Sequence, residues 1–200
     1  MQHEQDLTHS LRNVLGSRRI IVLGAVCGFG RSIVRALGDA GAQVVAVDGD
    51  AEGLSQLKGA MPLTLKGAPV DGLRRIGKAW GTARLDAVLN LMPLRKPSEI
   101  DLNIALLQGI VQGFMPALAA REGQIITVVA RPDQALDVAE GAMAPALVSA
   151  QDAFVHALRR DGLTLNLISV GPEAVAPART AILGLLQGAV RPLNGAELRL

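Results

Sequence analysis

The sequence predicts an α/β protein with a doubly wound parallel sheet in three layers, and three observations carry this prediction. Short apolar runs without polar alternation, such as residues 20–23, are typical of strands buried on both faces of a parallel sheet. Segments with helical spacing of apolar residues alternate with these runs along the chain. A glycine-rich turn joins the first run directly to the first such segment. We therefore expect helices on both faces of one sheet.

The composition fits a single domain. Half of the 200 residues are hydrophobic, which is enough for one sizeable core in residues 18–200. Residues 1–17 are mainly polar and are expected to form a tail. The apolar residues of this tail have helix-like spacing, so it forms either a short amphipathic arm that docks on a neighbour or a partly ordered tail.

Charge and cysteine content limit the function classes. The formal net charge of +2 is small and the basic residues are scattered, so neither nucleic acid nor a membrane is expected as a partner. Cys27 is the only cysteine, which excludes an internal disulfide and fits a reducing compartment. We interpret the apolar stretches as too short to span a bilayer, and the first ten residues lack the apolar core of a signal peptide. A cytoplasmic location follows.

The first strand, turn, helix and second strand together predict a dinucleotide site. Three glycines follow the first strand: Gly24, Gly28 and Gly30. Glycines let a phosphate approach the backbone at the N-terminus of the helix that begins near Arg31. The second strand, residues 44–47, ends at Asp48, whose carboxylate can accept hydrogen bonds from a ribose diol and would repel a 2′-phosphate. The pattern favours NAD over NADP; the alternative is that the glycines serve only strand-to-helix packing.

The rest of the chain continues the alternation. The apolar runs predict five further strands, at residues 63–65, 85–91, 125–129, 163–169 and 196–200. The segments of helical spacing predict five further helices, at residues 51–58, 70–80, 100–120, 145–160 and 178–187. Pro145 stands in the first turn of its predicted helix, where proline is tolerated. Residues 133–141 before it predict a loop or short turn.

The helix predicted at residues 100–120 is apolar around nearly its whole circumference. One sheet can cover only one side of such a helix, so a second covering surface is required. Glycines at 109 and 113 would let another helix approach closely. We interpret the face with Leu106, Ile110 and Phe114 as a subunit contact, because an exposed apolar face is an aggregation hazard in a monomer. The alternative is an unusually well-buried core helix.

These motifs resemble one known family. The spacing G-x-x-x-G-x-G in LGAVCGFGRSIVRALGDAGAQVVAVD is similar to the cofactor turn of the Rossmann-like short-chain dehydrogenases/reductases, with Leu23 in place of the usual Thr. Later segments resemble that family in the same order: WGTARLDAVLN, DLNIALLQGIVQGFMPAL, GQIITVVA and LTLNLISVGP. The resemblance covers nearly the whole chain from Arg18.

The cofactor pocket departs from the family pattern. Asn90 matches the first Asn of the N-N-A-G motif, whose backbone lies against the cofactor in relatives. The rest of that motif is replaced by Leu91, Met92 and Pro93. These residues bring bulk and remove one N–H donor where small residues permit close approach. In addition, Lys66 and Gly67 stand where relatives carry an Asp that contacts the adenine ring.

The resemblance implies hydride transfer that uses a Tyr as acid/base, a Lys, a Ser and an Asn. Matching VSAQDAF to Y-x-A-S-K-A-A places Val148 at the Tyr position and Asp152 at the Lys position. The Ser position falls on Ala130, and only the Asn is retained, as Asn103. The chain contains no tyrosine at all, so a shifted alignment cannot restore the acid/base. Only residues 173–194 separate the last two strands, which leaves the substrate lid missing or vestigial.

No replacement chemistry follows from the sequence. Asp152 and His156 are four residues apart on one predicted helix and are expected to form an ion pair at the helix surface or at an interface. Ser149 lies about 10 Å from His156 along that helix, too far for a triad. Cys27 beside a helix N-terminus is interpreted as a small residue in a tight turn. No metal-ligand spacing occurs in the sequence.

We expect a protein without Tyr-dependent redox chemistry that serves as a noncatalytic subunit or scaffold. It would associate with itself or with a catalytic relative of the same fold through the helices at residues 100–120 and 145–160. NAD would bind weakly or not at all. One alternative is an NAD-dependent oxidoreductase with displaced catalytic groups, and another is an NAD-sensing binding module.

Overall fold

The computed structural model of the chain describes residues 14–132, 138–158, 161–171, 174–188 and 193–200. Its centre is a seven-stranded sheet, parallel throughout, in the order β3-β2-β1-β4-β5-β6-β7. The strands are β1 (Arg19–Leu23), β2 (Gln43–Asp48), β3 (Ala60–Thr64), β4 (Ala87–Asn90), β5 (Gln124–Ala130), β6 (Thr164–Val170) and β7 (Glu197–Arg199). The strand order reverses between β1 and β4, which is the topological switch point of a doubly wound fold.

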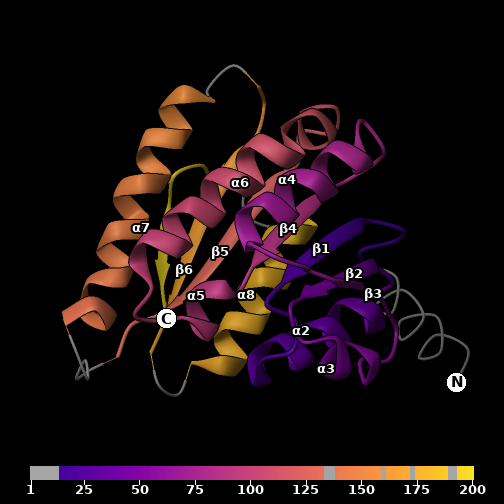
Figure 1. Ribbon diagram of the computed structural model, residues 1–200, viewed down its shortest axis with the longest axis horizontal. Coiled ribbons are helices and arrows are strands. Elements are labelled where there is room, and N and C mark those ends of the chain that lie inside the picture. Colours follow the sequence, from indigo (N-terminus) through magenta and orange to yellow (C-terminus); the bar gives the residue numbers. More distant parts are fainter. Residues whose placement is uncertain (1–13, 133–137, 159–160, 172–173, 189–192) are drawn as a thin grey trace, which may run out of the picture.

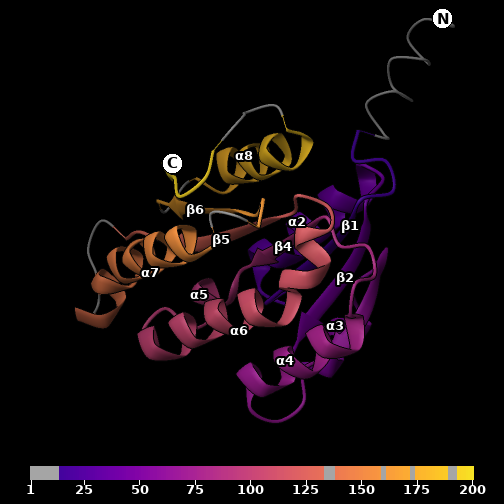
Figure 2. The ribbon, with the colours of Figure 1, turned by 90° about the horizontal axis from the view of Figure 1, so that it is seen from above.

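Helices cover both faces of this sheet and complete three layers (Figure 1). They are α2 (Gly28–Asp39), α3 (Ala51–Ser55), α4 (Pro69–Trp80), α5 (Met92–Arg95), α6 (Ile100–Ala119), α7 (Val138–Ala157) and α8 (Val175–Gln187). Figure 2 shows α8 and α2 on one side of the sheet and α4, α6 and α7 on the other. The predicted fold class is confirmed.

The central strand β1 shows why its residues form an unbroken apolar run. Ile20 and Val22 pack with the residues of α2 and α8, whereas Ile21 and Leu23 pack with those of α4 and α6. All four side chains are fully buried. Because both faces of the strand are covered, the alternation of polar and apolar residues that marks a half-exposed strand is absent.

The expectation that α6 presents an exposed apolar face to a partner subunit was wrong. Leu106, Ile110 and Phe114 are covered within the chain itself, with exposed fractions of 1% or less. The second covering surface is α4, which packs along α6 at close range. A Cβ added to Gly77 of α4 would collide with the backbone of Gly113, so the two glycines let the helix backbones touch.

The same helix corrects the expectation that no segment could span a membrane. Among the described residues, α6 alone is long and apolar enough for this by length and composition. Half of its most apolar stretch is buried inside the chain. Burial between a sheet and a neighbouring helix is typical of the core helix of a soluble protein.

Two other elements differ from their predictions. α7 begins at Val138, so Pro145 lies inside the helix and not in its first turn, and residues 138–141 are helical where a loop was expected. Residues 133–137 lie outside the described part of the chain. The short helix α5 was not predicted, although it follows β4 directly and carries Arg95. The remaining boundaries shift by a few residues.

The residues just before β1 belong to the folded core. Leu15, which we assigned to the polar tail, is 1% exposed and packs with the cluster on the α2 side of the sheet. Its backbone N–H donates to the carbonyl of Ala40 at 2.9 Å, and that of Ser17 donates to the carbonyl of Gly41 at 3.3 Å. The chain therefore docks against the end of α2 before it enters the sheet.

Candidate functional site: a cleft at the carboxyl edge of the sheet

The glycine turn between β1 and α2 lies at the carboxyl edge of the sheet, beside the switch point. Gly24 has a φ of +80°, and a Cβ there would lie 3.0 Å from the carbonyl carbon of Leu91. A Cβ on Gly30 would lie 2.6 Å from the carbonyl oxygen of Ala25. Both positions therefore require glycine. Gly28 has open space around it, so no contact within the chain demands a glycine there.

The first turn of α2 is capped by a side chain of the turn itself. Cys27 is the N-cap, and its Sγ accepts a hydrogen bond from the N–H of Gly30 at 3.2 Å. Burial raises the pKa of the Cys27 thiol, against the backbone hydrogen bonds and the charge of Arg95, which lower it. The thiol is therefore neutral near pH 7 and is no activated nucleophile. It satisfies helix N–H groups that would otherwise face an anion.

Asp48 stands at the end of β2 as predicted, but its carboxylate is bound by its own chain. The side chain is 3% exposed. Oδ2 accepts from the N–H of Val26 at 3.1 Å and pairs with an Nη of Arg95 at the same distance. Oδ1 accepts from the N–H of Asp50 at 3.2 Å. A ribose diol would have to displace Arg95 to reach this carboxylate.

The segment after β4 fills the cleft between the glycine turn and Asp48. Asn90 is fully buried; its Oδ1 accepts from the N–H of Met92 at 3.2 Å, and its Nδ2 has no partner among the described residues. Leu91 is fully buried against Gly24, and Met92 is 9% exposed. The bulk expected at these positions is present. Met92 begins the additional helical turn α5, and this turn places Arg95 beside Asp48.

The positions matched to the catalytic Asn, Ser and Tyr lie on α6, β5 and α7, and two of the three carry side chains without a polar group. Asn103 is fully buried in α6, where its Nδ2 donates to the carbonyls of Lys96 and Glu99 at 2.8 and 3.0 Å, and its Oδ1 has no partner among the described residues. Val148 packs on α7 with the cluster that contains Leu147. Ala130 ends β5, and its side chain has no ionisable group.

Farther along α7, Asp152 and His156 do not form a catalytic group. Asp152 and His156 are both exposed on α7. The ion pair expected between them does not form, since no contact within 4.0 Å joins the two groups. Asp152 lies toward Gly195, just before β7, instead of toward the glycine turn. A carboxylate therefore occupies the helix position where the family pattern has an ammonium group.

A mainly apolar hollow of about 450 Å³ lies beside the glycine turn. Its described lining comes from the glycine turn and the start of α2, from α5, from the ends of β5 and β6, and from the start of α8: Cys27, Gly28, Phe29, Leu94, Ala130, Pro132, Val170, Gly171 and Val175. Cys27 is the only titratable residue in this lining, and its thiol is held neutral. The lining offers no general acid or base near neutral pH, so it can bind but has no means of proton transfer.

The residues of the cleft fit only part of the dinucleotide that the resemblance implies. Gly24 and Gly30 keep the backbone turn tight, and the buried Nδ2 of Asn90 is a donor without a partner. The adenosine end does not fit as the side chains lie, because Arg95 holds the ribose-binding carboxylate. Sequence reasoning missed Arg95. The only local sign of Arg95 in the sequence is its place two residues after Pro93, because proline is common in the first turn of a helix.

Between β6 and β7, the described residues form α8 and its short connections. α8 packs on the α2 side of the sheet, where Ala178 and Ile182 are fully buried. The loss of the substrate lid stays a prediction.

Comparison with known proteins identifies the fold. No protein-family model matches the chain, and no curated protein matches it. Solved structures do. A short-chain dehydrogenase/reductase from Burkholderia xenovorans superposes with a TM-score of 0.78 at 16% identity, over 94% of this chain and 96% of that one. RhlG from Pseudomonas aeruginosa, solved with NADP, superposes with a TM-score of 0.77 at 18% identity. The superposition covers 94% of this chain and 97% of RhlG.

A metagenomic short-chain oxidoreductase in complex with NADP gives a TM-score of 0.73 at 22% identity, over 93% of this chain and 98% of that one. Identities this low establish the fold and no more. The chain has the fold of the short-chain dehydrogenases/reductases along nearly its whole length, as the motifs predicted.

Proposed function

We propose that this chain is a noncatalytic member of the short-chain dehydrogenase/reductase family that works as a subunit or scaffold. The observation that carries the proposal is the absence of tyrosine from all 200 residues. The family pattern requires a phenol at the position matched by Val148, and an alkyl side chain cannot exchange a proton. Loss of a general acid/base alone removes about 10²–10⁴-fold of rate.

The residues around that position support the proposal. Asp152 replaces an ammonium group by a carboxylate, so a neighbouring acid would be made weaker instead of stronger. Ala130 provides no hydroxyl to orient a carbonyl oxygen. Losing the acid/base, its activator and the orienting hydroxyl together is poorly explained by a change of substrate.

Weak nucleotide binding is part of the same proposal. The two NADP complexes among the similar structures make a nucleotide ligand reasonable for this fold. In this chain the Arg95–Asp48 pair must break before a ribose can bind, and Arg95 then loses its buried partner. This cost is subtracted from the binding free energy of any dinucleotide. The retained glycines keep NAD sensing as the second candidate function.

The partner in this proposal is a second copy of the chain or a catalytic relative of the same fold, bound through α7 and the outer surface of α6. The α6 face with Leu106, Ile110 and Phe114 takes no part, because it is buried within the chain. In the family these two helices form a four-helix contact between subunits. The solvent face of α7 carries small side chains, among them Pro145, Ser149 and Ala153, over which another helix could pack closely. We also propose that the protein is cytoplasmic and has no nucleic-acid or membrane partner. The small net charge and the fold support this proposal.

Assays of the purified chain with NAD(H) and NADP(H) over a panel of alcohols and carbonyl compounds test the proposal. We expect no turnover above the rate without protein. Steady turnover that disappears in Asp152→Ala or His156→Ala would overturn the noncatalytic assignment and support displaced catalytic groups. Tight NAD binding that Asp48→Ala abolishes, without turnover, would favour the sensor function.

A further inference from the structure

A second hollow in the described part of the chain lies at the amino edge of the sheet, opposite the glycine turn. Its volume is about 620 Å³, within the range of small-molecule sites. Its walls come from the chain before β1 and β4, from the start of β5 and β6, and from the end of α8. Nothing in the proposed function involves this hollow.

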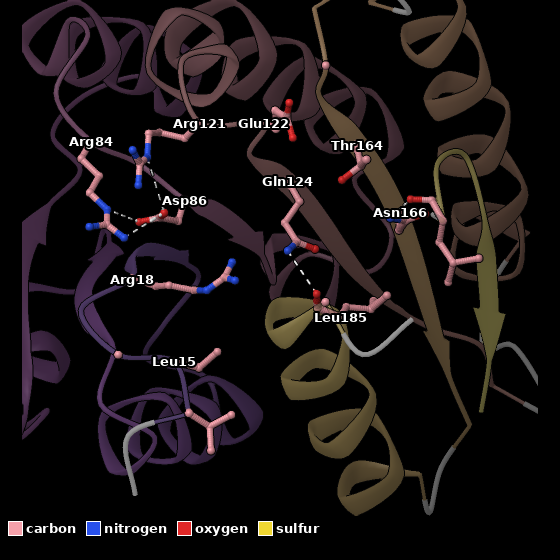
Figure 3. A pocket seen from close by; sticks show the side chains of 15 residues that line it. Leu15, Arg18, Arg84, Asp86, Arg121, Glu122, Gln124, Thr164, Asn166 and Leu185 are labelled. Carbon is pink, nitrogen blue, oxygen red and sulfur yellow. Dashed lines mark hydrogen bonds and ion pairs between the residues drawn. The ribbon is translucent and has the colours of Figure 1, made fainter. Parts of the chain in front are cut away.

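Three arginines from separate segments line it. Arg18 precedes β1, Arg84 precedes β4, and Arg121 follows α6. Figure 3 shows the guanidinium groups of Arg84 and Arg121 next to Asp86, each joined to it by a dashed line, with Arg18 pointing toward the space between Asp86 and Gln124. The fold therefore gathers three cations that lie up to about a hundred residues apart in the sequence.

One carboxylate serves two of these arginines. Asp86 accepts from Nε of Arg84 at 2.9 Å and from the N–H of Arg19 at 2.8 Å, and Nε of Arg121 lies 4.0 Å away. Burial raises the pKa of Asp86, but these hydrogen bonds and the two positive charges outweigh it, so the pKa lies below its ordinary value. Asp86 is therefore ionised near pH 7, and both of its oxygens accept hydrogen bonds from the protein.

The charge balance of the hollow is positive. Arg18 has no carboxylate partner within 4.0 Å among the described residues. Among the described residues of the lining, the other acid is the exposed Glu122. Three guanidinium groups thus face two carboxylates, and the more buried of the two is already paired.

The C-terminal end of α8 also borders the hollow. α8 ends here with its carbonyl groups, which favour cations. The Nε2 of Gln124 donates to the carbonyl of Leu185 at 3.2 Å, and the N–H of Gly188 donates to the same oxygen at 3.0 Å. The carbonyl of Leu185 is thus satisfied by the chain, and Arg18 is the arginine of the lining that has no carboxylate partner among the described residues.

From the three arginines around this recess we propose a site for a small molecule that carries phosphate groups. Guanidinium groups bind phosphate oxygens through paired, charge-assisted hydrogen bonds. The site is a recess of limited volume, so it fits a small phosphate better than a membrane surface or a nucleic-acid backbone. It lies at the edge away from Asp48, so a ligand here would not compete with a dinucleotide.

Calorimetric titration of the full chain with inorganic pyrophosphate, at constant ionic strength, tests the site. We expect saturable binding that Arg18→Gln weakens by about tenfold or more, because one charge-assisted pair is lost. Arg121→Gln is expected to act in the same direction. The matched control is Arg35→Gln, which makes the same charge change on the exposed side of α2 and is expected to leave the affinity within about twofold.

Four results would overturn the proposal. They are no saturable binding, equal weakening by the control, an unchanged affinity in both Arg18→Gln and Arg121→Gln, and binding only to vesicles that contain anionic lipid. An unchanged affinity in both variants would place the anion at the glycine turn. Denaturation curves of the variants that overlay the parent curve separate loss of the site from loss of the fold. Enzyme activity plays no part in the readout, so this test and that of the proposed function can fail independently.

Discussion

Asp48 is almost fully buried, and a buried carboxylate is stable only when its oxygens have partners. Val26 and Asp50 supply backbone N–H groups, and Arg95 supplies the positive charge. The same carboxylate would hold a ribose if the cleft bound a dinucleotide. One residue thus connects the stability of the chain with the access of a cofactor.

Arg95→Ala is expected to lower the free energy of unfolding by about 1–3 kcal/mol, because the buried Asp48 loses its charged partner. It is also expected to increase the affinity for NAD, since no intrachain pair has to break. Urea denaturation and calorimetry with NAD measure the two effects. Arg75→Ala, which removes an exposed arginine on α4, is the control. If NAD affinity in Arg95→Ala equals that of the parent, Arg95 does not obstruct the cleft.

The lowered pKa of Glu197 predicts how the stability of the protein depends on pH. Burial raises its pKa, but hydrogen bonds from Ser169, Arg131 and Arg199 outweigh this and lower the pKa below the ordinary 4.5. The stability that Glu197 contributes is therefore complete above pH 4.5 and is lost as pH falls through the lower pKa of the folded state. Glu197→Gln is expected to be about 1–2 kcal/mol less stable at pH 7. In urea titrations this difference should shrink by pH 3; a constant difference would contradict it.

At the scale of elements, the contact between α4 and α6 depends on glycines that meet backbone to backbone. Gly77→Ala is expected to destabilise the protein by about 1–3 kcal/mol, because the new methyl group collides with Gly113. Gly184→Ala on α8 is the matched control, since nothing lies within 4 Å of its Cβ position. Alanine in an open helical position is expected to stabilise by about 0.5–1 kcal/mol. Urea midpoints that move in the same direction for both variants would contradict this account of the helix contact.

Element types could be predicted because each leaves a period or a run in the sequence. β1 is visible as an apolar run because both of its faces are buried, and Gly24 and Gly30 are visible because backbone contacts forbid a side chain. The start of α7 was missed because the helix continues through Pro145, against the local preference. The covered face of α6 was missed because periodicity shows that a helix is buried but not which neighbour buries it.

Much of the candidate site depends on contacts between distant residues, which local patterns do not contain. The positions of Asp48 and Asn90 could be predicted, because each ends a recognisable strand. The pair between Asp48 and Arg95 joins residues 47 positions apart and needs the unpredicted helix α5. The three arginines of the hollow at the amino edge come from three segments, and none of these segments carries a motif of its own.

At the scale of the whole molecule, assembly is the open prediction. Ala153→Glu places a charge on the exposed face of α7, where the proposed partner helix would pack. We expect the parent to be a dimer or larger at micromolar concentration and the variant to shift to monomer, as measured by light scattering. Ser55→Glu, on exposed α3, is the control and should leave the mass unchanged. A parent chain that is monomeric and well folded would sink the subunit proposal.

The strand order has a consequence for the way the chain folds. β1 pairs with β2, which follows soon after it, and also with β4, which is made only after β2 and β3. During synthesis the apolar edge of β1 must therefore wait for some seventy further residues before it is paired. Unpaired apolar edges are prone to wrong partners, and non-local parallel pairing is slow. Folding of this chain thus depends on what shields that edge while the second half of the sheet is still being made.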